Sequence, residues 1–372
     1  MATPNNPSQT SLMIVDDSAV IRGLFSKVLE TESGITVVAK ASGGEQAIQT
    51  LKRLAASGQT VDVMTLDIQM PDMDGLEALP KLLAIMPDMK VIMASTLSTK
   101  GAKETLEALA MGAADYLAKP DTKGKRELLI QFGNELASKV KILGKRRATS
   151  GEKGVKPVLE GGVSGVSDYT LRSSSNVLKP SVLAIGSSTG GPQALISVLT
   201  QISKKKINIP ILVTQHMPAE FTAVFAQQVQ NSTGLTCTEG IDGATLVPGH
   251  VYIAPGNYHM LAEKDGAKVV IRTNQDEPEN FCRPAVDPML RSLVKAYGGR
   301  VLTVILTGMG SDGMRGAKVV VDKGGVVIAQ DRKTSVVWGM PRAVADAGLC
   351  TKVTPLGDIG REIILLSQGQ IG

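Results

Sequence analysis

Residues 182–192 read Val-Leu-Ala-Ile-Gly-Ser-Ser-Thr-Gly-Gly-Pro, and this stretch decides the fold of the second half of the chain. The apolar run predicts a buried strand, the glycines predict a turn, and the pattern through Leu199 predicts a helix. Such a turn lifts its hydroxyls above the end of a parallel strand, beside the free N–H groups of the helix. The spacing fits neither Gly-x-Gly-x-x-Gly nor a P-loop. The turn alone leaves anion binding and nucleophilic attack equally open.

The composition favours two or three domains in a reducing compartment. The chain has 372 residues, of which 43% are hydrophobic, enough for real cores at about 100–200 residues per domain. Three widely spaced cysteines form neither a disulfide framework nor a zinc cluster. The polar first ten residues carry no signal pattern, and no apolar run reaches the roughly 18 residues that cross a bilayer. We therefore expect a soluble cytoplasmic protein without membrane insertion.

The positive charge of the chain points to a linker. Residues 123–157 hold ten Lys or Arg against three Glu, an excess larger than the net charge of +5 for the whole chain. A solvated basic tether explains this more simply than a nucleic-acid surface, because only five Phe, five Tyr and one Trp are present to stack on bases. We expect no nucleic-acid partner.

The first segment alternates apolar runs with helical patterns. Strands are expected at residues 11–15, 35–39, 61–66, 91–94 and 114–117, and helices at residues 18–30, 44–54, 76–85, 101–111 and 125–143. Five such units predict an α/β domain with a doubly wound, five-stranded parallel sheet of the flavodoxin-like kind. Periodicity is lost between residues 145 and 179, where Gly, Ser, Lys and Arg dominate. We expect an N-terminal domain over residues 10–143, a flexible basic linker over 144–178 and a C-terminal domain over 179–372.

The C-terminal segment predicts a second α/β domain with a mostly parallel sheet. Strands are expected from residue 182 and at 209–214, 250–254, 268–272, 301–306 and 326–329, and helices from Pro192 and at 218–230, 284–297, 313–322 and 356–367. Residues 255–257, Pro-Gly-Asn, lie between extended runs and predict the loop of an antiparallel hairpin.

Polar side chains follow four strands of the first domain. They are Asp16 and Asp17, Asp67, Ser95 with Thr96, and Lys119. The carboxyl ends of parallel strands meet in one crevice, although each carboxylate taken alone is more often a loop residue or helix cap. Three clustered carboxylates need a cation, and Mg²⁺ is the ion that hard oxygens favour. Asp67 could then accept a phosphoryl group as an acyl phosphate, with the metal and Lys119 offsetting the charge.

This order and spacing over residues 10–143 resembles the receiver domain of bacterial response regulators. The resemblance implies phosphorylation of Asp67 by a partner histidine kinase, with Mg²⁺ held by Asp16, Asp17 and Asp67. It also implies that Ser95, Lys119 and Tyr116 occupy the positions that respond to the phosphoryl group.

Three strand ends of the second domain carry a serine pair, His216 and Asp312. A serine hydroxyl needs a histidine to take its proton, and the histidine needs a carboxylate to hold its tautomer. Taken singly, a histidine is more often a packing or surface residue, and Asp312 lies where a helix N-cap would be. The order Ser, His, Asp differs from that of the α/β-hydrolases, and Gly-x-Ser-x-Gly is absent.

The motifs of residues 186–191, 215–218, 248–256, 283–287 and 307–313 resemble those of the chemotaxis protein-glutamate methylesterases, the CheB family. The resemblance covers about residues 179–370, and a preceding receiver domain is also part of it. It implies Ser188 as nucleophile, because the family nucleophile directly precedes Thr-Gly-Gly. It further implies His216 as general base and Asp312 as its orienting carboxylate. Thr189 and the N–H of Met309 match groups near the oxyanion, and we expect Arg283 to contact substrate and His250 and His259 to be structural.

The implied function is a phosphorylation-activated esterase. It would hydrolyse glutamyl methyl esters on the cytoplasmic helices of chemoreceptors to glutamate and methanol, deamidate receptor glutamines, and need no cofactor in the esterase site. Autoinhibition by the unphosphorylated receiver is expected as well. Two rivals are a non-enzymatic receptor adaptor and a transcriptional regulator, and the lack of a helix-turn-helix pattern counts against the second.

Overall fold

The computed structural model describes residues 9–119, 126–144, 169–173, 178–205 and 207–369. These residues belong to two compact units, Met1–Val163 and Ser164–Gly372. The division between the units falls inside the expected linker, most of which lies outside the described residues. Its described part includes Tyr169, whose ring packs against Trp338 of the second unit with centroids 6.3 Å apart.

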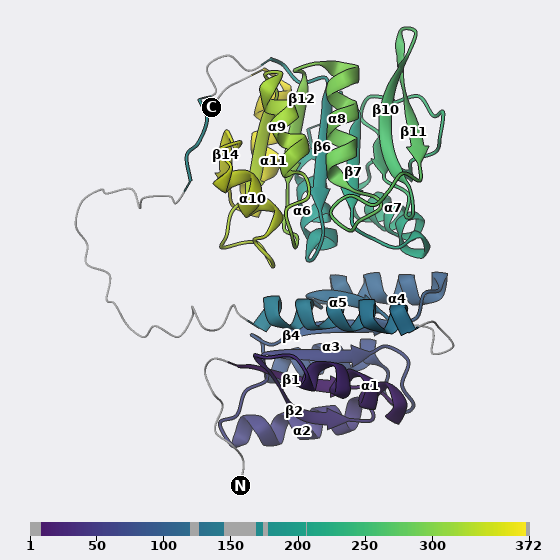
Figure 1. Ribbon diagram of the computed structural model, residues 1–372, viewed down its shortest axis with the longest axis vertical. Coiled ribbons are helices and arrows are strands. Elements are labelled where there is room, and N and C mark those ends of the chain that lie inside the picture. The colour runs from purple at the N-terminus through teal and green to yellow at the C-terminus, as the bar shows by residue number, and fades with distance from the viewer. Residues whose placement is uncertain (1–8, 120–125, 145–168, 174–177, 206, 370–372) are drawn as a thin grey trace, which may run out of the picture. The chain divides into compact units, whose positions relative to one another are not determined.

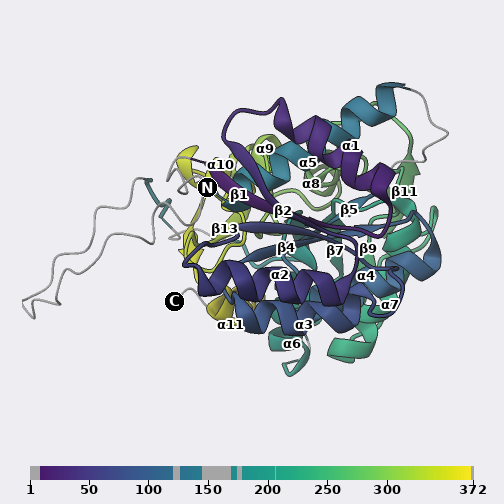
Figure 2. The same cartoon turned by 90° about the horizontal axis from the view of Figure 1, so that it is seen from below.

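The first unit is a five-stranded parallel sheet in the order β2-β1-β3-β4-β5. Helices α1 and α5 cover one face and α2, α3 and α4 cover the other (Figure 2). Side chains of Ser18, Asp74 and Ser98 cap the N-termini of α1, α3 and α4. The strands are β1 (Thr10–Val15), β2 (Ile35–Ala41), β3 (Val63–Asp67), β4 (Lys90–Ser95) and β5 (Asp115–Ala118). The helices are α1 (Ala19–Glu30), α2 (Gly44–Ala56), α3 (Gly75–Ile85), α4 (Thr99–Ala110) and α5 (Arg126–Gly144).

The second unit contains a seven-stranded parallel sheet and a separate two-stranded antiparallel hairpin (Figure 1). The sheet has the order β14-β13-β12-β6-β7-β9-β8, and β10 pairs with β11 in the hairpin. The strands are β6 (Val182–Ser187), β7 (Ile211–Gln215), β8 (Cys237–Glu239), β9 (Val251–Ile253), β10 (His259–Asp265), β11 (Lys268–Asn274), β12 (Val301–Ile305), β13 (Val326–Gln330) and β14 (Lys352–Thr354). The helices are α6 (Gly191–Ser203), α7 (Ala219–Thr233), α8 (Val286–Tyr297), α9 (Met314–Asp322), α10 (Met340–Asp346) and α11 (Leu356–Ser367).

The fold class expected from the sequence is confirmed, but the expected position of the hairpin loop was wrong. Residues 255–257 form a loop that precedes β10, and the hairpin turns at Gly266, where φ is +59°. Asp265-Gly266 is itself a strong turn signal, because glycine adopts positive φ without steric cost. The sequence pattern does not reveal this turn, because the strand before it, β10, ends in three exposed residues, Glu263 to Asp265, and lacks a clear alternation of apolar and polar residues. The short elements β8, β14 and α10 were not expected either.

Helix α8 packs tightly against the centre of the large sheet. Its side chains Val286, Leu290 and Leu293 are fully buried, and burial of an aliphatic side chain of this size stabilises a fold by about 1.5–3 kcal/mol. A Cβ at Gly186 in β6 would lie only 2.7 Å from a methyl group of Val286. Glycine at this position therefore lets α8 approach the strand that ends at the serine pair.

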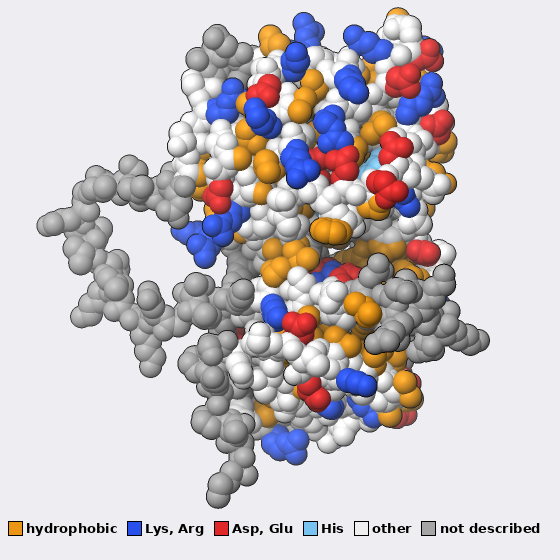
Figure 3. All heavy atoms as spheres, viewed as in Figure 1, with side chains coloured by type: hydrophobic (Ala, Val, Ile, Leu, Met, Phe, Trp, Pro, Cys, Tyr) orange, Lys and Arg blue, Asp and Glu red, His pale blue; other side chains and the backbone are white. Residues whose placement is uncertain are grey.

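The face of the second unit formed by α8 and α9 carries mixed charges (Figure 3). Ion pairs there join Arg291 to Glu279 and Lys318 to Asp322. Within the described part of the chain, no helix is both long enough and apolar enough to span a bilayer.

Candidate functional site

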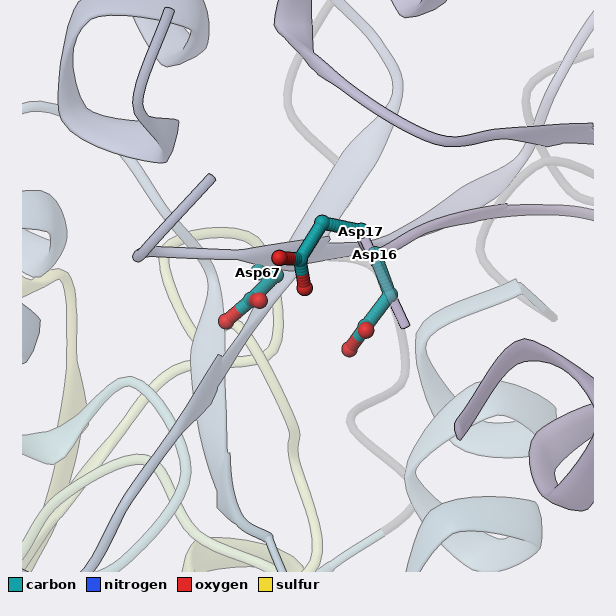
Figure 4. Close-up of side chains that lie close together, drawn as sticks. All are labelled: Asp16, Asp17 and Asp67. Atoms are coloured by element: carbon teal, nitrogen blue, oxygen red, sulfur yellow. The ribbon is translucent and has the colours of Figure 1, made fainter. Parts of the chain in front are cut away.

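Three carboxylates meet at the carboxyl edge of the first sheet. Asp16 and Asp17 follow β1, Asp67 ends β3, and ligand oxygens of the three lie within 4.8 Å of one another (Figure 4). Asp16 and Asp67 are buried, whereas Asp17 is exposed. The structure thus brings together the three residues that the sequence predicted as metal ligands.

Lys119 compensates part of this negative charge. Its Nζ lies 2.8 Å from Oδ2 of Asp16 and 2.8 Å from Oδ2 of Asp67. Burial raises the pKa of the Asp67 carboxyl, Lys119 lowers it, and the charges of Asp16 and Asp17 raise it again, so that the net pKa is raised. Lys119 therefore does not fully compensate the negative charge of the pocket, and a further positive charge would be stabilised there. A hard divalent cation such as Mg²⁺ suits an all-oxygen donor set.

A cavity of about 200 Å³ opens beside Asp67 and is lined by Asp17, Ser95, Thr96, Glu104 and Lys119, among others. Glycines allow close backbone packing around these strand ends. A Cβ at Gly101 would lie 2.6 Å from the carbonyl oxygen of Thr96, and a Cβ at Gly75 would lie 2.1 Å from that of Asp67. The starts of α3 and α4 can approach these carbonyl groups this closely only because both positions lack a side chain.

Two of the three predicted switch residues, Ser95 and Tyr116, are buried. Ser95 donates a hydrogen bond to the carbonyl oxygen of Gly101 at 3.2 Å. The ring of Tyr116 lies against Nζ of Lys139, 5.4 Å from the ring centroid, and Lys139 pairs with Asp115 at 2.6 Å. Ser95 lines the cavity at Asp67, and Tyr116 lies on the neighbouring strand.

The second sheet distinguishes the two serines of the glycine turn. Ser187 is fully buried at the end of β6, and its Oγ donates a 2.6 Å hydrogen bond to Oε1 of Gln215. Ser188 begins the turn and is only half-buried. A hydroxyl that must reach substrate fits Ser188, whereas Ser187 serves the packing of β6 against β7.

Gln215, the last residue of β7, links the glycine turn after β6 to the end of β7 by hydrogen bonds. Its Nε2 donates to the carbonyl oxygens of Ser188 at 3.0 Å and His216 at 3.2 Å. A Cβ at Gly191 would lie 2.0 Å from Oε1 of Gln215, so glycine is needed where α6 begins. Sequence reasoning assigned no role to Gln215, although its place directly before His216 at a strand end was a usable signal.

His216 and Asp312 are in direct contact. Nε2 of His216 lies 2.8 Å from Oδ2 of Asp312. Burial raises the pKa of the Asp312 carboxyl, but hydrogen bonds from His216 and from the backbone of Val286 and Asp287 lower it below its ordinary value. Asp312 therefore remains ionised inside the protein and holds the imidazole by one nitrogen.

The other nitrogen of His216 has a neighbour that the sequence did not suggest. Nδ1 lies 3.4 Å from Sγ of Cys282. Burial lowers the pKa of His216, but hydrogen bonds with Asp312 and Cys282 outweigh it and raise that pKa to about 10. The imidazole is thus a strong base, with Nε2 at Asp312 and Nδ1 at Cys282.

The predicted oxyanion residues Thr189 and Met309 lie in segments next to Ser188, whereas Arg283 follows Cys282 in another segment. Thr189 is buried in the turn, and Met309 follows Gly308, where a Cβ would lie 2.9 Å from Cβ of Ser188. The glycine lets the Met309 segment approach the serine. Nη1 of Arg283 donates to the carbonyl oxygens of Gln275 and Asp276 at 2.9 and 3.0 Å. These contacts hold a loop, and the expected substrate contact of Arg283 stays a prediction.

The remaining histidines make local contacts. His250 stacks on Tyr252 with ring centroids 4.3 Å apart, and its Nε2 lies 2.9 Å from Oγ1 of Thr238. His259 is 1% exposed, and its Nδ1 accepts from the backbone N–H of Ala285 at 3.2 Å.

Comparison with known proteins identifies both units. The family model described as CheB methylesterase matches residues 183–363, and that of the response regulator receiver domain matches residues 12–130. A protein-glutamate methylesterase/protein-glutamine glutaminase of Paramagnetospirillum magneticum is 48% identical over 373 residues, covering 96% of each chain. One from Azospirillum brasilense is 49% identical over 362 residues, covering 94% of this chain and 90% of its own.

A solved structure, the CheB methylesterase catalytic domain of Thermotoga maritima, is 40% identical and covers 51% of this chain and 100% of its own, with a TM-score of 0.49. The sequence relatives match both units in one continuous alignment. Because identity near one half extends over almost the whole length of both chains, the protein belongs to the CheB family of protein-glutamate methylesterase/protein-glutamine glutaminases, with an N-terminal response-regulator receiver domain.

Proposed function

We propose that this protein is a phosphorylation-activated protein-glutamate methylesterase with a Ser188, His216 and Asp312 triad. It hydrolyses glutamyl methyl esters on chemoreceptors and also deamidates receptor glutamines, in the adaptation step of a chemosensory pathway. The observation that carries the proposal is the 2.8 Å contact of His216 with Asp312, at the carboxyl ends of the strands on either side of β6, whose following turn begins with Ser188. The names of the relatives support the substrate class.

The proposed reaction is acyl transfer in two halves. His216 takes the proton of Ser188 through Nδ1 as Oγ attacks the ester carbonyl, and it returns that proton to the departing methoxide, which leaves as methanol. Water, deprotonated by His216, then attacks the glutamyl ester of Ser188, and His216 gives this proton to Oγ of Ser188 as glutamate is released. Throughout, Asp312 keeps the Nε2–H proton in place and stabilises the imidazolium.

Thr189 and the N–H of Met309 are proposed to stabilise the oxyanion that forms at the carbonyl. Arg283 is proposed to contact the substrate. A glutamine side chain can follow the same route with ammonia as the leaving group, and no step requires a cofactor in the esterase site.

In the receiver we propose that Asp67 accepts the phosphoryl group from a chemotaxis histidine kinase. Asp16, Asp17 and Asp67 would hold Mg²⁺, which would neutralise charge on the phosphoryl oxygens. Lys119, Ser95 and Tyr116 would respond to the new group. The proposed domains are the receiver over residues 10–143, a linker over 144–178 and the esterase over 179–372. The proposed site of action is the cytoplasm, on the cytoplasmic part of the receptors.

The assignment of Ser188 is tested by replacing each serine of the pair. Ser188→Ala should lower methanol release from methylated receptor by roughly 10³-fold or more, and adding His216→Ala should cost little more, because triad members act as a unit. Ser187→Ala should keep most of the activity and lose about 1–3 kcal/mol of stability, since Oε1 of Gln215 loses its buried donor. Full activity of Ser188→Ala would rule out Ser188 as the nucleophile.

The pH dependence of kcat/KM tests the role of His216. Its raised pKa keeps the imidazole protonated at neutral pH, so kcat/KM should rise with pH as the base form appears. Because Cys282 contributes to the raised pKa, Cys282→Ala should move this rise to lower pH. Cys237→Ala, which alters a buried thiol elsewhere, is the matched control and should leave the profile in place. A profile that is flat from neutral to alkaline pH would contradict the role of His216 as base.

The receiver chemistry is tested by labelling with a small-molecule phosphodonor. Asp67 should be labelled only with Mg²⁺ or a similar divalent ion present, and Asp67→Asn should abolish labelling while the exposed Asp88→Asn does not. The raised pKa of Asp67 means that its ionised form costs stability at neutral pH, so Asp67→Asn should not lower the Tm. Equal labelling in EDTA would rule out the metal.

Regulation is tested by removing the receiver. A chain beginning at about residue 165 keeps the contact of Tyr169 with Trp338. It should release methanol faster than the unphosphorylated full chain and ignore phosphodonor, because a phosphoryl group acts only by favouring one receiver conformation over another. If the shortened chain is no faster, the receiver acts by activation or by recruitment to receptors instead of by inhibition.

A further inference from the structure

Residues 279–282 form a tight turn beside the proposed triad. The N–H of Glu279 donates to the carbonyl oxygen of Cys282 at 3.2 Å, and the N–H of Cys282 donates to the carbonyl oxygen of Glu279 at 2.9 Å. Both central residues, Asn280 and Phe281, have positive φ values, +52° and +62°. This conformation is unfavourable for a bulky residue such as Phe281, whose side chain is fully exposed and gains nothing from burial. Contacts elsewhere in the turn must therefore hold it.

The turn is fixed at its first residue by α8. Both terminal nitrogens of the Arg291 guanidinium donate to the Glu279 carboxylate, Nη1 to Oε2 at 3.0 Å and Nη2 to Oε1. A two-point contact of this kind sets orientation as well as distance. The turn is thus anchored to the same helix whose first residues donate to Asp312.

Asn280 bridges two buried carboxylates. Its Nδ2 lies 2.9 Å from Oδ1 of Asp312 and 3.1 Å from Oδ2 of Asp287. An amide –NH₂ has two hydrogens, so one group can serve both carboxylates at once. Asp287 and Asp312 are 0% and 1% exposed, and both burial and the charge of Asp312 raise the pKa of Asp287. Among the described side chains, Asn280 supplies the donor that these two mutually repelling groups share.

This donor limits how Asp312 can turn. Oδ1 of Asp312 also accepts from the N–H groups of Asp287 at 3.1 Å and Gly313 at 2.8 Å. Oδ2 is thereby left for the N–H of Val286 at 2.6 Å and for Nε2 of His216. With both oxygens held, the hydrogen of the neutral imidazole stays on Nε2, and Nδ1 keeps the lone pair that a general base needs.

We propose that Asn280 is a positioning residue of the esterase, which holds Asp312 in the orientation that fixes the tautomer of His216. The inference rests on the proposed triad. The same turn places Cys282 against Nδ1 of His216. Asn280 of the turn thus contacts Asp312, and Cys282 contacts His216. The ionisable groups facing His216 are Asp312 from the segment after β12 and Cys282 from the turn, with Asp287 of α8 one hydrogen bond further away.

Asn280→Gly is the direct test, because glycine keeps the left-handed backbone and removes only the amide. In the full chain, assayed with phosphodonor and Mg²⁺, kcat should fall about 10–100-fold, the range typical of partners that orient a catalytic group, with little change in KM or Tm. The matched control is Asn257→Gly, which also has positive φ, +65°, and an exposed side chain. It should leave kcat unchanged.

Asn280→Asp is the second variant and covers a failure of the first to fold. It places a third carboxylate next to Asp312, so the pKa of His216 should rise and the pH profile of kcat/KM should move by about one unit or more to higher pH. A residue that merely shapes the turn would lower the Tm of Asn280→Gly and would not lower kcat alone. Unchanged kcat in Asn280→Gly, or an unmoved profile in Asn280→Asp, would overturn the proposal while Ser188→Ala remained inactive. Activity in Ser188→Ala would instead remove the proposed triad itself.

Discussion

The second unit depends on one buried charge, the carboxylate of Asp312. It accepts hydrogen bonds from the backbone of Val286, Asp287 and Gly313, from the amide of Asn280 and from the ring of His216. An ionised carboxylate is costly to bury without such donors. Burial of the Asp312 carboxylate therefore requires that the segment after β12, the start of α8 and the 279–282 turn are all folded. Packing of α8 on the sheet, made possible by Gly186, is therefore a condition for the contact of Asp312 with His216 as well as for the core.

Both units place their chemistry by the same rule. In each, reactive side chains leave the carboxyl ends of neighbouring parallel strands, at the point where the winding of the sheet reverses. The first unit gathers carboxylates around Lys119, which suits phosphate and a divalent cation. The second gathers a hydroxyl, an imidazole and a carboxylate, which suits acyl transfer. The difference in function follows from which side chains stand at equivalent edges.

Much of the fold was predictable because the hydrophobic periodicity of most strands and helices is clear in the sequence. The ten elements of the first unit and the main elements of the second follow from apolar runs and helical stripes. The exceptions have local causes. The three-residue strands β8 and β14 are too short to show a hydrophobic period. The seven-residue helix α10 makes only about two turns, which is also too short. The hairpin was misplaced because its turn, Asp265-Gly266, lies among exposed charged residues.

The sequence by itself determined the α/β plan of both halves, the acidic cluster and the serine pair, histidine and aspartate at three strand ends, since these residues follow strands that can be read from the hydrophobic pattern. The choice of Ser188 within the pair came from the resemblance to the CheB family. Only the tertiary structure decided how these residues are arranged. It separated buried Ser187 from accessible Ser188, assigned Nε2 of His216 to Asp312, and brought Asn280 and Cys282 to the site. These outcomes depend on side-chain burial and on hydrogen bonds between residues up to 96 positions apart, which neither periodicity nor motif spacing encodes.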